Sequence, residues 1–81
     1  MPPRQQPATP PGLPPIPTGA YKKAYYPYPD TVYYLQTPND DEWSRGTISN
    51  ETQSTSLHTV IDDETGEIYY VYVQYIRKRP S

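Results

Sequence analysis

Proline is concentrated at one end of the chain, and this limits where regular structure can form. Eight of the twelve prolines fall within the first 17 of the 81 residues. Proline has no backbone N–H donor and fixes φ, so this stretch can form neither a helix nor an interior strand. We therefore expect residues 1–19, in which Arg4 is the one charged residue, to be a disordered tail that samples polyproline II.

An aromatic segment follows the proline-rich tail. Residues 20–30 read AYKKAYYPYPD, with four of the ten tyrosines of the chain. Pro27 and Pro29 exclude a central strand here, because proline cannot donate to a sheet ladder. We expect an extended aromatic arm that packs across the rest of the domain.

From residue 31 onward, short β-branched and aromatic runs alternate with turn residues, which predicts strands. The expected strands are residues 31–36, 43–49, 55–61, 67–73 and 76–79. The run from Asp62 to Gly66 favours a hairpin, since Gly66 can adopt a positive φ, and Gln74-Tyr75 predicts one tight turn before the last strand. No segment has a sustained 3.6-residue apolar repeat, so no helix of consequence is expected.

Five short strands in about fifty residues predict an all-β protein, an SH3-like five-stranded antiparallel barrel spanning residues 31–80. At 81 residues the chain has room for one domain. The core must come from few side chains. Those expected in it are Val32, Leu35 or Tyr34, Trp43, Ile48, Leu57, Val60 or Ile61, Val71, Val73 and Ile76.

Several short motifs in this region occur together in known families. In order they are VYY, an acidic loop, WSRGTI, LHTVIDDETGEIYY and YIRKRP. Over residues 30–80 this pattern resembles a Tudor-type domain, and also the C-terminal SH3-like domain of retroelement integrases, especially the gypsy-type ones. The Tudor resemblance implies a ligand that is a cation, often a methylated Lys or Arg, held in an aromatic cage. The integrase resemblance implies contact with DNA or chromatin through basic residues.

The chain departs from both families at specific positions. On the Tudor pattern the cage positions fall near Gln36, Trp43, Asp62 and Thr65, of which only Trp43 is aromatic. On the integrase pattern the segment after Gly66 is rich in Arg, whereas residues 67–75 here read EIYYVYVQY.

The charge of the chain separates these two alternatives. Residues 31–76 contain eight acidic residues and one basic residue, a formal charge of −7. Nucleic-acid affinity comes largely from neutralising phosphates, which such a charge opposes. The basic residues on either side of this region, apart from Arg4 in the tail, could touch phosphate as flexible ends of the domain. They are Lys22, Lys23, Arg77, Lys78 and Arg79.

The acidic residues predict a pocket for a cation at one end of the barrel. Two loops that an SH3-like barrel brings together are acidic, and Trp43 would stand at the mouth of the first. An aromatic face beside carboxylates attracts a cation. The expected ligand-binding residues are Trp43, Asp40, Asp41, Glu42, Asp62, Asp63, Glu64 and Tyr34. The alternative is that both loops are solvated turns and that Trp43 belongs to the core.

Two further surfaces are candidates for protein contacts. Strand alternation turns Tyr70 and Tyr72 outward, and with Tyr75 they could dock a peptide or self-associate, unless the aromatic arm covers them. In the tail, Arg4, Pro7 and Pro10 fit a motif read by SH3 or WW domains. The alternative is a linker without a partner.

We expect no catalysis, no cofactor and no metal site. There is no cysteine to act as a nucleophile, and the single histidine, His58, leaves no zinc cluster. Thr55, Ser56 and Thr59 carry hydroxyls near His58, but the alternation of a strand does not favour the convergence that a triad needs. No apolar run reaches the roughly 20 residues that span a bilayer, and the N-terminus lacks the apolar core of a signal peptide. We expect an intracellular protein, with the nucleus as one candidate location.

Overall fold

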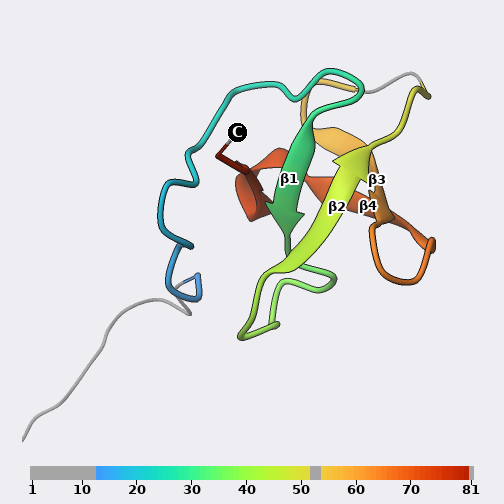
Figure 1. Cartoon of the computed structure of the whole chain (residues 1–81). Helices are drawn as coiled ribbons and strands as arrows, with labels where there is room; N and C mark the ends of the chain where they lie inside the picture. The colour runs from blue at the N-terminus through green and yellow to red at the C-terminus, as the bar shows by residue number, and fades with distance from the viewer. Residues whose placement is uncertain (1–12, 52–53, 81) are drawn as a thin grey trace, which may run out of the picture.

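The fold consists of five antiparallel strands and one short helical turn (Figure 1). The computed structural model describes residues 13–51 and 54–80. The elements are β1 (Thr31–Tyr34), β2 (Ser44–Ile48), β3 (Leu57–Asp62), β4 (Ile68–Tyr72), the 3₁₀ helix η1 (Val73–Tyr75) and β5 (Ile76–Lys78). Each predicted strand is present, with ends that differ by at most two residues from the expected ones, and η1 lies at the predicted tight turn. The motif at Arg4, Pro7 and Pro10 lies outside the described residues.

The strands form one sheet in the order β4-β3-β2-β1-β5. All four pairings are antiparallel. The fold class is therefore all-β, as predicted, and the strand order with a short helical turn before the last strand is compatible with an SH3-like fold. Because β5 pairs with β1, the chain ends of the domain lie side by side in the sheet.

The β3–β4 hairpin is closed by the turn that the sequence predicts. Gly66 has a φ of 76°, a conformation that glycine adopts at little cost. The Asp62 carboxylate accepts hydrogen bonds from the backbone N–H groups of Glu64 and Thr65, at 2.8 and 2.9 Å. An aspartate that bonds the backbone two residues on is a common turn device, and here it fixes the path of the chain between the two strands.

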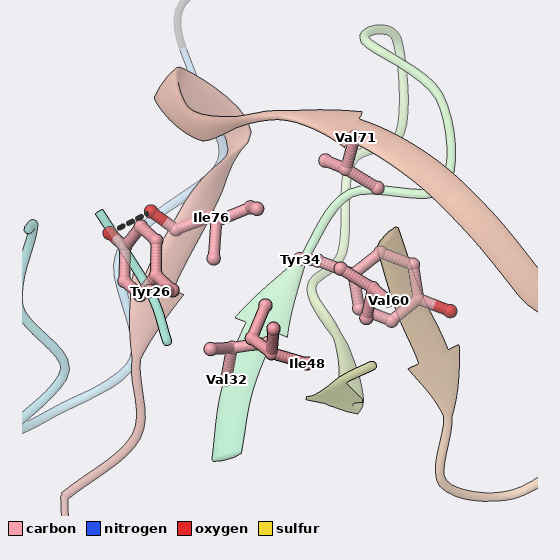
Figure 2. Close-up of a cluster of buried hydrophobic side chains, with 7 residues drawn as sticks. All are labelled: Tyr26, Val32, Tyr34, Ile48, Val60, Val71 and Ile76. Atoms are coloured by element: carbon pink, nitrogen blue, oxygen red, sulfur yellow. Dashed lines mark hydrogen bonds between the residues drawn. The ribbon is translucent and has the colours of Figure 1, made fainter. Parts of the chain in front are cut away.

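Every strand contributes to a single core (Figure 2). The buried apolar side chains are Tyr26, Val32, Tyr34, Leu35, Ile48, Val60, Val71 and Ile76. Gly46 lets β2 approach this core closely, because a Cβ there would lie 2.6 Å from Cγ1 of Val60 and 3.0 Å from Cε1 of Tyr34.

Three residues expected in the core lie elsewhere. Leu57 is exposed because it is paired with Tyr72 on the outer face of the sheet. Trp43 is half-buried, since it precedes β2 at the end of the sheet. Val73 packs only against the margin of the core.

The aromatic arm is part of this fold (Figure 1). Tyr21 and Lys78 exchange two backbone hydrogen bonds, so the arm begins by pairing with the outer edge of β5. Tyr26 is fully buried, and its hydroxyl donates to the carbonyl oxygen of Ile76 at 2.8 Å (Figure 2). Its backbone N–H donates to Nε2 of His58 at 3.1 Å. Tyr26 thereby closes one side of the core.

Candidate functional site

A cleft of about 250 Å³ lies at the end of the sheet where the β1–β2 loop meets the β3–β4 turn. Its walls come from the β1–β2 loop, the start of β2, the end of β3 and the β3–β4 turn. The lining residues are Gln36, Glu42, Trp43, Ser44, Arg45, Asp62, Glu64 and Thr65. Two loops that are about 20 residues apart in sequence therefore form one site, because β1, β2 and β3 are adjacent strands.

The four positions at which the Tudor resemblance would place a cage all line this one cleft. They are Gln36, Trp43, Asp62 and Thr65. Trp43 is the only aromatic residue among those that line the cleft. Glu42 and Glu64 add carboxylates to the walls, so any attraction for a cation comes mostly from charge.

Asp62 is the most constrained of the acidic residues. It is buried, and its Oδ2 accepts a 2.6 Å hydrogen bond from the hydroxyl of Tyr34 and a 3.3 Å bond from Nε2 of Gln36. The hydrogen bond from Tyr34 is the main reason that the pKa of Asp62 falls to about 2, although burial opposes the shift. Burial raises the pKa of Tyr34, and the bond to Asp62 raises it further. Asp62 is thus a fixed negative charge beneath the cleft.

Four predicted ligand residues do not line the cleft: Tyr34, Asp40, Asp41 and Asp63. Tyr34 is fully buried and reaches the site through its bond to Asp62 and through a 3.5 Å hydrogen bond that its hydroxyl accepts from Nε2 of Gln36. Asp40 accepts bonds from the backbone N–H groups of Gln36 and Thr37, at 3.0 and 3.3 Å, and so shapes the β1–β2 loop. Asp63 is not among the lining residues, and its carboxylate instead contacts Thr47 and Arg79.

The carboxylate of Asp63 is bound to two side chains outside the cleft. Its carboxylate forms a 2.8 Å ion pair with Arg79 and accepts a 2.9 Å hydrogen bond from Oγ1 of Thr47. Asp41 is exposed and is not among the lining residues. The two acidic runs therefore contribute Glu42, Asp62 and Glu64 to the cleft.

Trp43 presents two different surfaces to the rest of the molecule. The guanidinium of Arg77 lies 5.6 Å from the centre of its ring, within the range of a cation–π contact. At the edge of the ring, the Nε1–H group donates hydrogen bonds to the carbonyl oxygens of Pro14 and Pro15, at 3.3 and 3.0 Å. Neither contact was predicted, because no local sequence pattern links residues about 30 positions apart.

The basic residues expected at flexible ends are largely held by the fold. Arg77 and Lys78 belong to β5, and Arg79 is paired with Asp63. Lys23 forms a 2.6 Å ion pair with Asp30 in the arm. The prediction of flexible basic ends was wrong for these four residues, because β5 pairs with β1 and the arm folds onto the sheet. Lys22 is exposed.

The tyrosine stripe is open on the outer face of the β3–β4 hairpin. Tyr70 and Tyr72 are 67% and 55% exposed, and the arm does not cover them. Across the strand pair they face Thr59 and Leu57, and Ile68 extends the same face. Tyr75 lies apart, half-buried against the core.

His58 has a structural role within the fold. It is fully buried, accepts the N–H of Tyr26 at Nε2, and makes an edge contact with the ring of Tyr25 at 4.8 Å. Burial lowers its pKa, while the backbone carbonyls of Leu57 and Ser54 partly offset the shift. In the described part of the chain no three acidic, histidine or cysteine side chains come together as a metal ion would need.

Comparisons with models of known families, with curated proteins and with solved structures give no match for this chain. The fold and the cleft are therefore the grounds for any functional assignment. They define a small all-β domain whose architecture suits an interaction module. Across residues 13–51 and 54–80, no helix has the length and apolar character needed to cross a membrane.

Proposed function

We propose that this protein is a non-catalytic interaction module that binds a basic or methylated side chain of another protein in the cleft beside Trp43. The observation that carries the proposal is the composition of the cleft walls. Three carboxylates, one guanidinium and an indole ring are among the groups that line the hollow. The net negative wall and the ring attract the same ligand, a cation.

The carboxylates at the rim are available for such a ligand. Within the described residues neither Glu42 nor Glu64 takes part in an ion pair, and both are exposed. The volume of about 250 Å³ is below that of typical drug-sized pockets. It suits the end of one long side chain better than a whole small molecule.

The contact between Arg77 and Trp43 supports the proposal that the ligand is a cation, because it shows the Trp43 ring beside a cationic group of the same chain. The ring already holds a guanidinium of the same chain at 5.6 Å. Cation–π contacts contribute about 0.5–1 kcal/mol at exposed sites and more when desolvated. A ligand cation would therefore use the remaining ring surface together with Glu42 and Glu64, and its affinity should be modest.

The proposal is tested by titrating the labelled full chain with peptides that contain trimethyllysine or dimethylarginine, followed by NMR. We expect shifts at Glu42, Trp43 and Glu64. The double variant Glu42→Gln/Glu64→Gln should weaken binding by about threefold to tenfold, because each exposed charge contact is worth about 0.2–1 kcal/mol. Added salt should weaken binding in the same direction.

Asp41→Asn is the matched control, since Asp41 is an exposed acid of the same loop outside the cleft. It should leave the affinity nearly unchanged. Equal losses in Asp41→Asn and in the double variant would indicate diffuse charge attraction and would overturn the cleft assignment. NMR shifts that appear with duplex DNA and not with the peptides, and that are confined to Lys22 and β5, would instead favour the integrase-like alternative.

A second candidate function is self-association through the tyrosine stripe. It is favoured by the position of β4, an outer strand of the sheet, with Ile68, Tyr70 and Tyr72 all more than half exposed. Exposed apolar edge strands are prone to pair with another chain. Sedimentation velocity tests it: a coefficient that rises with concentration in the unaltered chain and not in Tyr70→Ser/Tyr72→Ser would support it.

A further inference from the structure

The segment LPPIP, residues 13–17, is held in an extended conformation by its own composition. Three of its residues are prolines, whose φ is fixed near −65°. The other two, Leu13 and Ile16, precede prolines and are therefore restricted to extended conformations. The prolines lack N–H donors, so the carbonyl oxygens of this polyproline II stretch have no internal partners.

Trp43 supplies a donor to two of these carbonyl oxygens. Its Nε1–H is shared between Pro14 and Pro15, at 3.3 and 3.0 Å. Pro14 is also half-buried, while Pro15 and Ile16 are exposed. The segment therefore lies along the indole edge with one side against the domain and the other in solvent.

The chain delivers this segment to Trp43 through an anchored turn. The N–H of Ala20 donates to the carbonyl oxygen of Pro17 at 3.0 Å, and Gly19 has a φ of 85°. Gly19 is packed so closely on Pro80 that a Cβ would lie 3.2 Å from its Cγ. The next residue but one, Tyr21, is paired with Lys78. Docking in cis thus costs little chain entropy beyond the ordering of residues 13–17.

We infer that the indole edge of Trp43 is a recognition site for a proline-rich, polyproline II segment of a partner protein, and that Pro14 and Pro15 occupy it in cis. A polyproline II strand suits the site because it is preformed and presents unpaired carbonyl oxygens. An indole offers a large flat surface that can pack against proline rings, and one N–H donor that can bond a carbonyl oxygen of the strand. Such a ligand needs no charge, so the site differs in chemistry from the acidic cleft that Trp43 also lines.

The contact of Trp43 with Pro14 and Pro15 of the same chain is weak enough for a partner segment to replace it. A neutral hydrogen bond contributes only about 0.5–1.5 kcal/mol, and here one donor is shared between two acceptors. A short tether gives its ligand an effective concentration on the order of millimolar. A partner segment that adds contacts beyond those of residues 13–17 can therefore displace the tail, whereas a copy of the tail itself competes poorly.

The test uses the full chain and its single tryptophan, whose indole N–H gives one unambiguous NMR signal. In the variant Pro14→Gly/Pro15→Gly/Pro17→Gly the cis strand loses its rigidity, so the indole signal should move. Adding a peptide with the sequence of residues 10–19 should move the signal back toward its position in the unaltered chain. The unaltered chain should respond to the same peptide at least about tenfold more weakly, because its own tail occupies the site.

Two controls isolate the recognition. A peptide in which every proline is replaced by alanine should leave the indole signal unmoved. In Trp43→Phe combined with the tail variant, the ring remains but the donor is lost, so peptide binding followed at backbone amides should weaken by about threefold to tenfold. Unchanged signals of buried core residues such as Val60 would show that each variant is folded.

The inference is overturned if the glycine variant leaves the indole signal in place, since Pro14 and Pro15 would then not occupy the site in solution. It is overturned equally if the peptide causes no recovery. It is also overturned if the indole signal of the unaltered chain changes with protein concentration, which would identify the tail of a second copy as the occupant. The experiment is independent of the cation proposal. Binding of the proline-rich peptide should be insensitive to salt and to Glu42→Gln/Glu64→Gln. Binding of a methylated peptide should be weakened by both.

Discussion

The hydrogen bond between Tyr34 and Asp62 joins the core to the cleft. The phenol is fully buried and the bond is short, at 2.6 Å. Replacing Tyr34 with Phe removes the donor but keeps the ring. We expect a loss of about 1–3 kcal/mol in the free energy of unfolding, because a buried carboxylate loses its strongest partner. Urea unfolding measures the loss, and a carboxyl NMR titration should show that the pKa of Asp62 rises from about 2.

Tyr69→Phe is the matched control for this prediction. Tyr69 also donates its hydroxyl to a carboxylate, that of Glu67 at 3.0 Å, but this bond lies at the exposed surface. Its removal should change the free energy of unfolding by less than about 0.5 kcal/mol. A loss as large as that of Tyr34→Phe would mean that burial does not set the strength of the Tyr34–Asp62 bond.

The candidate site was predictable from sequence only in outline. The acidic runs and Trp43 identified the correct end of the sheet, because loop positions follow from strand order. Local sequence could not show that Asp40 closes its own loop or that Asp63 pairs with Arg79. Those outcomes depend on which donors the folded chain places beside each carboxylate. The contact of Trp43 with Pro14 and Pro15 depends in turn on the path of the whole arm.

At the scale of elements, the arm behaves as an additional piece of the sheet domain. Tyr26→Ala should lower the free energy of unfolding by about 3–5 kcal/mol, as for other large aromatic side chains removed from a core. Tyr21→Ala is the control, because the side chain of Tyr21 is half exposed and its two bonds to Lys78 use only the backbone. It should cost less than about 1 kcal/mol. Thermal unfolding of both variants gives the comparison, and similar midpoints would show that the arm is only loosely attached.

The strands were predictable where the arm was not. Residues 31–34 and 68–72 alternate between inward and outward positions, and the Asp62–Gly66 turn fixes the hairpin between two of the strands, so local pattern was sufficient. The sequence of the arm indicated that Pro27 and Pro29 exclude a central strand. It could not indicate that Tyr26, 32 residues before His58, would complete the core. Such a contact is a property of tertiary packing.

At the scale of the whole molecule, the single histidine should make stability depend on pH. His58 is buried with its Nε2 accepting the N–H of Tyr26, an arrangement that requires the neutral imidazole. Its Nδ1 has no hydrogen-bond partner within the described residues. Burial lowers the pKa of His58 below the 6.5 of the unfolded chain. Protonation would therefore favour the unfolded chain and, locally, release of the arm.

The sign follows from the two protonation states. Above pH 6.5 both folded and unfolded chains hold a neutral imidazole, so the full stability is present. As the pH falls below 6.5 the unfolded chain takes up a proton before the folded one, and the free energy of unfolding declines by at most about 1.4 kcal/mol per pH unit. The decline ends at the lowered pKa of the folded state. Asp62 cannot contribute in this window, because its stabilising effect is lost only below pH 4, toward its pKa of about 2.

Urea unfolding at intervals between pH 8 and pH 5 measures this dependence. His58→Gln is the informative variant, since the glutamine side-chain oxygen can accept the N–H of Tyr26 but does not titrate. Its stability should be lower than that of the unaltered chain at pH 8 and nearly constant down to pH 5. The amide signal of Tyr26 should meanwhile broaden or shift with falling pH only when His58 is present. Parallel declines in both chains would show that charges elsewhere set the pH response, and that the arm is not tied to the protonation of His58.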